Sequence, residues 1–460
     1  MASILHQIAQ NIGMDKAIAY TSGARIVQGI SGVGTMFFLS TFLTGIEQGF
    51  YFTFGSILAL QVFFELGLTG IMQQYVAHEA SHLNLDENKQ YQGEEQYQSR
   101  LASLVKFCLK WYSVLAGVVL VFLIIVGNIY FSKYGNSQSS SVEWKLPWII
   151  ICIGTSICIF QSPLTAILRG LGYVKDMSKI GFYGQIINPL CIWLGLVLGL
   201  KLYVMGIGFA MSVVIWQVYV IRKGLYRILT NLLKTKVSEK VNYFNEIFPY
   251  QWRIALSWIS GYFIFQLFNP VLFATEGAIV AGQMGMTLHA LNSIQSLSLS
   301  WMNTKIPMMS KLIALREYVK LDTMFKQTLK QMVSVCSVLL AAFFLCLCIL
   351  NTSQLEFNNT ILADRFLGYV PTLLMIVPIF LQQFTGSWAT YLRCHKKEPF
   401  LVNSVVGGLL CMASTIGLGN IFGLYGITVG YCIIQIFLCF WAHKIYISVF
   451  TTDYYSIFYR

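Results

Sequence analysis

Long apolar runs separated by short polar segments dominate the chain. Twelve of these runs reach about 20 residues, the length that a helix needs to cross the hydrocarbon core of a bilayer. Because backbone groups in hydrocarbon must be hydrogen-bonded within the segment, the runs are predicted to be helices and not strands. They lie at 19–42, 49–74, 112–131, 146–168, 180–200, 203–221, 252–274, 278–303, 331–350, 366–388, 399–418 and 421–442. The pattern predicts an all-α polytopic membrane protein with about twelve transmembrane helices.

The composition excludes a water-soluble globule. Of 460 residues, 56% are hydrophobic and 11% are charged, whereas an average soluble domain has about 25% charged residues. The 11 cysteines form no CxxC pair and no Cys/His cluster with metal-ligand spacing, so no metal site is expected. The N-terminal segment lacks a basic-then-apolar pattern, so no cleaved signal peptide is expected.

The basic charge follows the predicted topology. The net charge is +12. With both termini in the cytoplasm, the inner segments carry 26 of the 31 Lys and Arg residues, the outer segments carry four, and Arg25 lies within the first helix. The four outer cations are Lys133, Lys145, Lys201 and Arg365. This asymmetry is the one that the positive-inside rule requires. It predicts cytoplasmic termini and removes the reason to expect a nucleic-acid partner.

The two halves of the chain share three motifs in the same order. Ser31 and Glu47 are 16 residues apart, as are Ser260 and Glu276, and an Arg-Ile pair precedes each serine. The other two motifs are Leu168-Arg169 with Lys175-Asp176, matched by Leu392-Arg393 with Lys397-Glu398, and Gly199 with Gly206, matched by Gly419 with Gly426. Six helices per repeat make the repeats parallel. We therefore expect a six-helix lobe at 1–221, a cytoplasmic linker at 222–251 and a second six-helix lobe at 252–460 around a central cavity.

Three sequence segments carry a resemblance to a known family. They read GARIVQG at 23–29, QGFY at 48–51 and FELGL at 64–68. With the twelve-helix pattern, they resemble the multidrug/oligosaccharidyl-lipid/polysaccharide (MOP) exporter superfamily, and within it the O-antigen and polysaccharide-unit (Wzx-type) flippases.

That resemblance implies a multi-pass protein of the bacterial inner membrane that acts in O-antigen and lipopolysaccharide biosynthesis. Its substrate would be an oligosaccharide on undecaprenyl pyrophosphate, moved from the cytoplasmic to the periplasmic leaflet by alternating access. Its partners would be this anionic lipid-linked substrate, membrane lipids and other proteins of polysaccharide assembly. Lipid II flippases of the superfamily also carry arginines in helices one and seven, facing a central cationic cavity.

Five cations are candidates for binding an anionic headgroup. Arg25 lies about six residues inside its helix, roughly 9 Å deep, and an Arg fork suits phosphate oxygens. The alternative is that Arg25 snorkels to the inner interface. Arg253 is its repeat equivalent at the start of the seventh helix, where it is equally explained as an anchor. Lys305, Arg169 and Arg393 end the eighth, fourth and tenth helices, as anchors or as a cationic ring at the inner mouth.

Glu65 is the one acid well inside an apolar run. Its depth, roughly 14 Å from the inner end of its helix, favours either a buried pair with Arg25 or a proton or cation site that titrates during transport. Gln28, His289 and Asn292 are candidates to line a sugar-accepting cavity. The alternative is that they join helices by hydrogen bonds.

The sequence offers no catalytic constellation. It has neither a phosphate-binding glycine loop with Lys nor a Gly-x-Ser-x-Gly elbow, so no enzyme activity and no cofactor is expected. Two alternatives remain beside the flippase. A cation or drug exporter related to the MATE transporters would need an intramembrane acid in the first or seventh helix, where this chain has Arg25. A membrane polymerase or acyltransferase would need a large outer loop or a paired His and acid, for which His78–Glu79 is the candidate.

Overall fold

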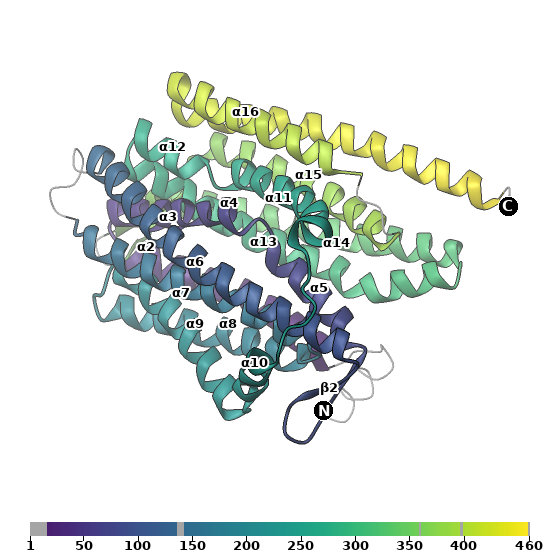
Figure 1. Ribbon diagram of the computed structural model, residues 1–460. Helices are drawn as coiled ribbons and strands as arrows, with labels where there is room; N and C mark the ends of the chain where they lie inside the picture. The colour runs from purple at the N-terminus through teal and green to yellow at the C-terminus, as the bar shows by residue number, and fades with distance from the viewer. Residues whose placement is uncertain (1–15, 136–141, 358–359, 396–398, 459–460) are drawn as a thin grey trace, which may run out of the picture. The chain divides into compact units, whose positions relative to one another are not determined.

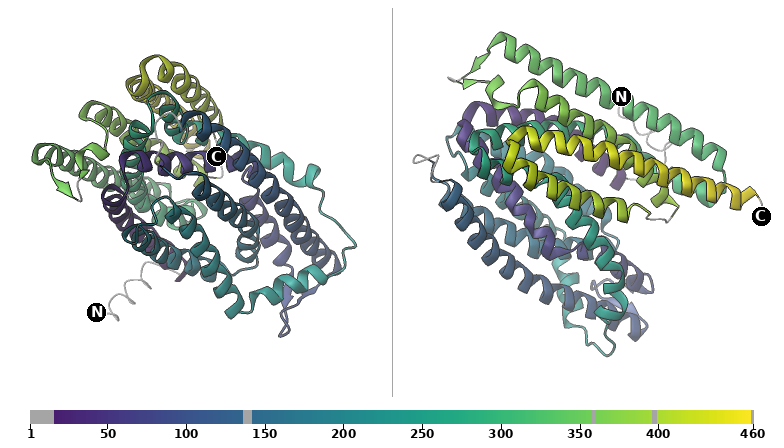
Figure 2. Two further views of the ribbon diagram at one scale, coloured as in Figure 1. Left: turned by 90° about the vertical axis from the view of Figure 1, so that its left-hand side faces the viewer. Right: turned by 90° about the horizontal axis from the view of Figure 1, so that it is seen from above.

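A computed structural model describes residues 16–135, 142–357, 360–395 and 399–458, and this part of the chain is almost entirely helical (Figures 1 and 2). Eight of its helices are long and apolar enough to cross a membrane, and the bent pair Gly45–Glu65 with Leu68–Ala80 makes a ninth. Two further predicted spans fall in helices of lower apolarity. The last two predicted spans lie together in one of the eight long helices. The all-α polytopic membrane fold is confirmed.

The first half of the chain supplies the first six predicted spans, with the second one divided between several helices. The helices are α2 (Lys16–Phe42), α3 (Gly45–Leu58), η1 (Ala59–Gln61), α4 (Val62–Glu65), α5 (Leu68–Ala80), α6 (Glu95–Tyr134), α7 (Lys145–Gly170), α8 (Val174–Val197) and α9 (Tyr203–Arg222). Between α5 and α6, strands β1 (Leu83–Leu85) and β2 (Tyr91–Gly93) form an antiparallel hairpin in which Leu83 pairs with Gly93. The linker forms α10 (Leu225–Lys234) and the π-helical turn η2 (Tyr243–Ile247).

The second half supplies the other six spans. Its helices are α11 (Phe248–Phe265), α12 (Phe268–Thr275), α13 (Ala278–Ala314), α14 (Tyr318–Ser353), η3 (Ala363–Arg365), α15 (Tyr369–Cys394) and α16 (Leu401–Phe458). A short antiparallel hairpin of β3 (Glu356–Phe357) and β4 (Thr360–Ile361) precedes η3. Helix α16 contains the last two predicted spans. Its backbone breaks at Gly423, where φ is +55°.

The repeat-related acids Glu47 and Glu276 both cap helices. Glu47 accepts the backbone N–H of Thr44 at 2.8 Å, while its own N–H donates to the Thr44 hydroxyl, which is the reciprocal pattern of a capping box. Glu276 accepts the N–H of Leu424 at 2.6 Å, immediately after the break in α16. A side chain at Gly423 would collide with this carboxylate. The break therefore lies at Gly423, inside the predicted span 421–442.

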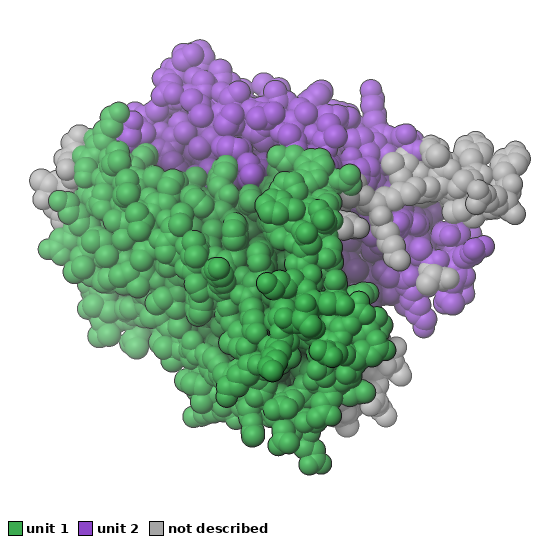
Figure 3. All heavy atoms as spheres, viewed as in Figure 1, with its two compact units in different colours: residues 1–27, 58–133, 143–258 green, residues 28–57, 134–142, 259–460 purple. Residues whose placement is uncertain are grey.

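The chain divides into two compact units, each described here by itself (Figure 3). The first contains residues 1–27, 58–133 and 143–258; the second contains 28–57, 134–142 and 259–460. The segment 28–57, from the first half of the sequence, thus packs with helices of the second half. The units differ in this respect from the predicted lobes, which were drawn at the linker.

Candidate functional site

The helices α2 and α13 stand out because neither reaches the apolarity of the other candidate spans. Helix α2 carries Arg25 and Gln28, and α13 carries His289 and Asn292. A helix surrounded by lipid on all sides would not tolerate such side chains. The polarity of these two helices indicates that each has a face turned toward protein or an aqueous space.

Arg25 is exposed on α2. The ion pairs of the described residues do not include one between Arg25 and Glu65. The guanidinium is therefore available to an anion, whether a phosphate of a substrate or a lipid headgroup at the interface.

The remaining predicted cations fall in both units. Arg253 is exposed near the start of α11, with its guanidinium 5.5 Å from the ring centre of its neighbour Trp252. Arg169 and Arg393 are exposed in the last turns of α7 and α15, where a cation favours the carbonyl end of a helix. Lys305 is half-buried and lies within α13, which continues to Ala314. In the repeat motif after Arg393, Lys397 and Glu398 lie outside the described residues.

Glu65 sits at a break in a spanning helix. Leu66 and Gly67 both adopt left-handed conformations, with φ of +52° and +68°, and the chain bends by 45° between the segments on either side. The half-buried carboxylate accepts the hydroxyl of Thr69 at 2.8 Å, in the first turn of α5. Tyr112 of helix α6 is fully buried and lies close to Thr69. Broken helices with an ionisable group are a recurrent form of ion site in transporters.

A buried polar junction in the second unit was missed by the sequence analysis. The side chain of Gln48 on α3 donates to the carbonyl of Gly282 at 2.8 Å and to that of Arg365 at 3.0 Å. The guanidinium of Arg365 donates to the carbonyl of Leu43 at 2.6 Å, and the residue is only 5% exposed. Arg365 was predicted as an outer-loop cation, yet it holds the end of α2 against the segment before α15.

Glycines bring α3 and α13 into backbone contact at this junction. A Cβ at Gly49 would lie 1.9 Å from the carbonyl oxygen of Ala278, and one at Gly285 would lie 2.3 Å from the Phe52 side chain. A Cβ at Gly282 would likewise lie 2.8 Å from the backbone N of Gly49. Only glycine permits so short a distance between the backbones of α3 and α13. The junction therefore joins helices two and eight of the predicted twelve more tightly than side-chain packing allows.

The polar candidates of the second unit divide into a buried network and an exposed edge. Gln295 donates to Gln382 at 2.7 Å, and Gln382 donates to the hydroxyl of Tyr431 at 2.9 Å, joining α13, α15 and α16. His289 is half-buried, and its Nδ1 has no hydrogen-bond partner among the described residues. Gln28 and Asn292, by contrast, are exposed. The amides of the network join helices, while Gln28 and Asn292 remain accessible to a ligand.

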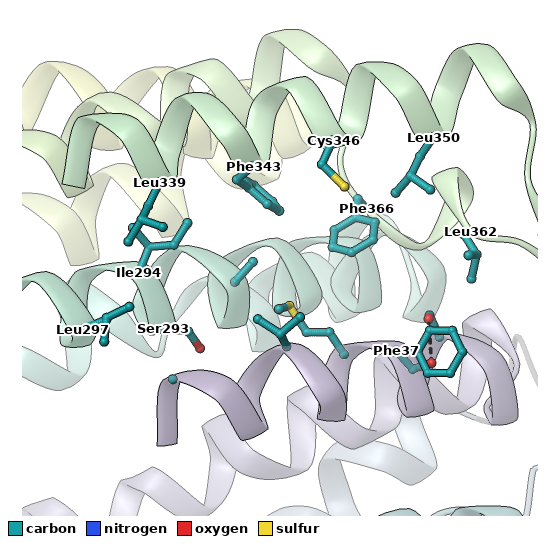
Figure 4. A pocket seen from close by; sticks show the side chains of 15 residues that line it. Phe37, Ser293, Ile294, Leu297, Leu339, Phe343, Cys346, Leu350, Leu362 and Phe366 are labelled. Atoms are coloured by element: carbon teal, nitrogen blue, oxygen red, sulfur yellow. Dashed lines mark hydrogen bonds between the residues drawn. The ribbon is translucent and has the colours of Figure 1, made fainter. Parts of the chain in front are cut away.

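An apolar groove of about 420 Å³ lies between α2, α13 and α14, entirely within the second unit. Figure 4 shows Phe343, Cys346 and Leu350 of α14 on one side of the groove. Ser293 and Leu297 of α13 and Phe37 of α2 lie on the other sides. Leu362 and Phe366 also line the groove. Its size falls in the range of ligand pockets.

Within the first unit, an ion-pair cluster ties the linker 222–251 to α5 and α6. Arg100 contacts the carboxylate of Glu79 at 3.0 Å and that of Glu246 at 2.7 Å, while the hydroxyl of Tyr75 donates to the Glu246 carbonyl. Glu79 is buried, so the candidate pair His78–Glu79 already uses its acid to bind Arg100. Burial opposes ionisation of Glu246, but hydrogen bonds from the Asn242 backbone and from Arg100 hold its pKa below the usual range.

Comparisons with known proteins place this fold. No protein-family model matches the chain, and no curated protein matches it. Among solved structures, the inward-facing conformation of a multidrug resistance MATE family transporter of the MOP superfamily aligns over 92% of this chain and 99% of its own, with a TM-score of 0.58 and 13% identity.

An outward-facing structure of a MATE family transporter of the same superfamily gives a TM-score of 0.54 at 14% identity, over 96% of this chain and 98% of its own. A Pyrococcus furiosus MOP transporter, described as having a binding pocket of reverse polarity that suggests a different function, gives 0.53 at 14% identity, over 94% of each chain. The chain therefore has the fold of the MOP-superfamily transporters.

Proposed function

We propose that this protein is a flippase that moves an oligosaccharide linked to undecaprenyl pyrophosphate from the cytoplasmic to the periplasmic leaflet of the bacterial inner membrane. Transport by alternating access is supported by the fold, and an anionic substrate is supported by the membrane-embedded cation Arg25. In this account both termini are cytoplasmic, and the flippase supplies O-antigen or another surface polysaccharide to its assembly proteins.

Arg25 is the observation that carries the proposal. A guanidinium in a spanning helix is costly unless it has an anionic partner or reaches water. Among the described residues no acid pairs with it. A pyrophosphate that leaves water has the complementary need, because its charge cannot cross hydrocarbon unpaired. Two bidentate contacts from one guanidinium fork would satisfy both groups.

The other candidates take supporting roles in this proposal. Arg253, on the repeat-related helix, would provide a second guanidinium for the pyrophosphate. Lys305, Arg169 and Arg393 would raise the local concentration of the anionic headgroup on the cytoplasmic side. Gln28, Asn292 and His289 would donate and accept hydrogen bonds with sugar hydroxyls.

Glu65 would couple transport to a proton or cation. A carboxylate at a broken helix, bonded to the Thr69 hydroxyl, is the kind of group at which transporters hold an ion. The likeness in fold to MATE family transporters supports a second candidate function, a MATE-like exporter of drugs or organic cations. The two candidate functions, flippase and exporter, differ in the sign of the charge that the substrate carries.

A complementation experiment tests the flippase function. A host that lacks its polysaccharide-unit flippase is given the unmutated chain, Arg25→Lys or Arg25→Ala at matched membrane levels, and surface polysaccharide is measured. We expect the unmutated chain to restore polysaccharide, Lys to restore part of it and Ala to restore least, because Lys keeps the charge but loses the fork. Full restoration by Arg25→Ala would remove the headgroup role of Arg25. Restoration by none, together with drug resistance, would favour the exporter.

A further inference from the structure

The last part of the linker lies against α6 and follows one side of that helix. The Ser99 hydroxyl, near the start of α6, accepts the backbone N–H of Glu239 at 2.7 Å. About two turns further along α6, the ring of Phe107 lies 5.4 Å from the ring of Tyr243 in the linker. All of these residues belong to the first unit. The linker therefore advances along α6 in the direction of the apolar part of that helix.

Helix α6 indicates how deep this part of the linker lies in the bilayer. At the helical rise its 40 residues extend over about 60 Å, twice a hydrocarbon core of roughly 30 Å. No charged residue occurs between Trp111 and Lys133, so this stretch is the part of α6 that crosses the hydrocarbon. Trp111 thus marks the level of an interface, where tryptophan is enriched. Because the ring of Tyr243 lies 6.3 Å from that of Trp111, the linker reaches this level.

The linker exposes further aromatic rings next to Tyr243. Phe244 is 73% exposed, and its ring lies 6.2 Å from that of Phe248, which is also exposed. Trp111 is exposed as well. We call Trp111, Phe244 and Phe248 the aromatic patch. Exposed apolar patches mark sites of interaction with membranes or with other proteins, and the depth of this one favours the membrane.

The charge around the aromatic patch is positive. The linker carries six Lys and Arg residues but only two acids. One of these acids, Glu246, is held by Arg100 in an ion pair, and the other, Glu239, is exposed. Lys240 is exposed in the linker, and Lys110 is exposed as the last charged residue of α6 before its uncharged stretch. These lysines lie on the water side of the patch, where phospholipid headgroups are found.

We propose that the aromatic patch docks the linker on anionic phospholipid, with the rings among the upper acyl chains and Lys110 and Lys240 against the headgroups. Exposed aromatic side chains combined with Lys are the pattern of segments that lie in the plane of the interface and are held by anionic lipid. A partner protein would have to displace the bilayer lipid that surrounds the protein at this depth. The proposal is independent of the substrate that the protein transports.

The test is site-specific photocrosslinking in nanodiscs of phosphatidylethanolamine and phosphatidylglycerol. A benzophenone amino acid replaces Phe244, Val118 or Thr230, and mass spectrometry identifies the lipid adducts. Val118 is exposed in the middle of the uncharged stretch of α6, and Thr230 is exposed on the polar side of α10. We expect the ratio of phosphatidylglycerol to phosphatidylethanolamine at Phe244 to exceed that at Val118 about fivefold, the factor that one Lys near an anionic surface supplies. Thr230 should capture no lipid.

Two double variants test the role of the lysines. Lys110→Gln with Lys240→Gln removes two charges beside the aromatic patch, and both side chains are exposed, so the fold should be kept. We expect the lipid ratio at Phe244 to fall to the ratio at Val118. Lys133→Gln with Lys145→Gln removes the same charge at the end of α6 and the start of α7, and it should leave the ratio at Phe244 unchanged. An equal fall in both double variants would contradict a local site.

Three other results would overturn the proposal. Equal lipid ratios at Phe244 and Val118 in the otherwise unmutated protein would show that the aromatic patch does not select anionic lipid. Lipid adducts at Val118 but none at Phe244 would show that the linker does not lie in the membrane. When the crosslinking is repeated in native membranes, a protein adduct at Phe244 in place of lipid would identify the patch as a surface for protein docking.

Discussion

The guanidinium of Arg365 donates a hydrogen bond to the carbonyl oxygen of Leu43 across 2.6 Å, although 322 residues separate them in the sequence. The contact fixes the C-terminal end of α2 to a segment of the second half. With the donation from Gln48 to the Arg365 carbonyl, it forms a closed polar junction in which Arg365 is 5% exposed. If the protein alternates between inward and outward access, this junction is what must open on the outer side.

Removal of the Arg365 charge should open the junction. A hydrogen bond to a charged group contributes roughly 1.5–3 kcal/mol, and about 1.4 kcal/mol is a tenfold change in an equilibrium. We therefore expect Arg365→Gln to raise the labelling rate of a buried reporter, Thr287→Cys, about tenfold or more with an impermeant thiol reagent. The reporter position is fully buried, and its hydroxyl accepts the N–H of Leu367 in this junction. Lys145→Gln, at an exposed outer cation, is the control; an equal rise in both variants would contradict a specific role for Arg365.

The close approach of α3 and α13 predicts a sharp difference between two glycines of one helix. In Gly49→Ala the new methyl group meets the Ala278 carbonyl and must separate the helices, at a typical overpacking cost of about 1–3 kcal/mol. In Gly55→Ala nothing lies within 4 Å of the new methyl, so the higher helix propensity should preserve or raise stability. Thermal unfolding in detergent measures both. Similar transition temperatures for the two variants would show that the helices do not depend on this contact.

Glu65 predicts a pH dependence of transport. Glu65→Gln keeps the size of the side chain and an oxygen that can accept from Thr69, but it cannot exchange a proton. We expect this variant to transport slowly and at a rate independent of pH, while Thr69→Ala, which retains the carboxylate, keeps a pH-dependent rate. The measurement is initial transport rate against pH in proteoliposomes. A pH profile of Glu65→Gln parallel to that of the unmutated protein would exclude Glu65 as the coupling group.

The cluster of Arg100, Glu79 and Glu246 predicts an acid-sensitive contact of the linker. Because the pKa of Glu246 is lower in the folded protein than in the unfolded chain, its ionised form stabilises the fold above the unfolded pKa. That contribution is lost as the pH falls through the folded pKa. Glu246→Gln should therefore lower the transition temperature at neutral pH and have no effect at strongly acidic pH. The effect should not exceed about 1 kcal/mol, since Glu246 is partly exposed. If the difference in transition temperature between Glu246→Gln and the unmutated protein grew on acidification, ionised Glu246 would not be the stabilising form.

The sequence predicted helices well because each apolar run is a local property. The break after Glu65 had a local signal in Gly67, since glycine readily adopts the left-handed conformation; the left-handed Leu66 had none. The second break, at Gly423, falls inside the apolar run predicted as the last span, because hydrophobicity alone does not mark where the backbone turns. The Arg365 junction could not be predicted, because it depends on which segments meet in space. Charge counting alone assigned Arg365 to a solvated loop.

The candidate site was predictable only as a set of residue types. Arg25 and Glu65 were recognisable because ionisable groups are rare in apolar runs. Whether they pair depends on helix rotation and bending, and the described structure records Thr69, not Arg25, as the hydrogen-bond partner of Glu65. The groove had no sequence signal, since Gly29, Ala290 and Ser293 each occur in an ordinary helical context.

The most direct test of the central claim is transport by the purified protein. Proteoliposomes containing the unmutated chain or Arg25→Ala are loaded with a fluorescent polyprenyl pyrophosphate-linked oligosaccharide, and its appearance in the opposite leaflet is followed by quenching from outside. In parallel, uptake of an organic cation such as ethidium is measured in the same vesicles. The account predicts rapid exchange of the lipid-linked probe by the unmutated protein, slower exchange by Arg25→Ala, and no cation uptake above protein-free vesicles. Cation uptake without movement of the lipid-linked probe would contradict it.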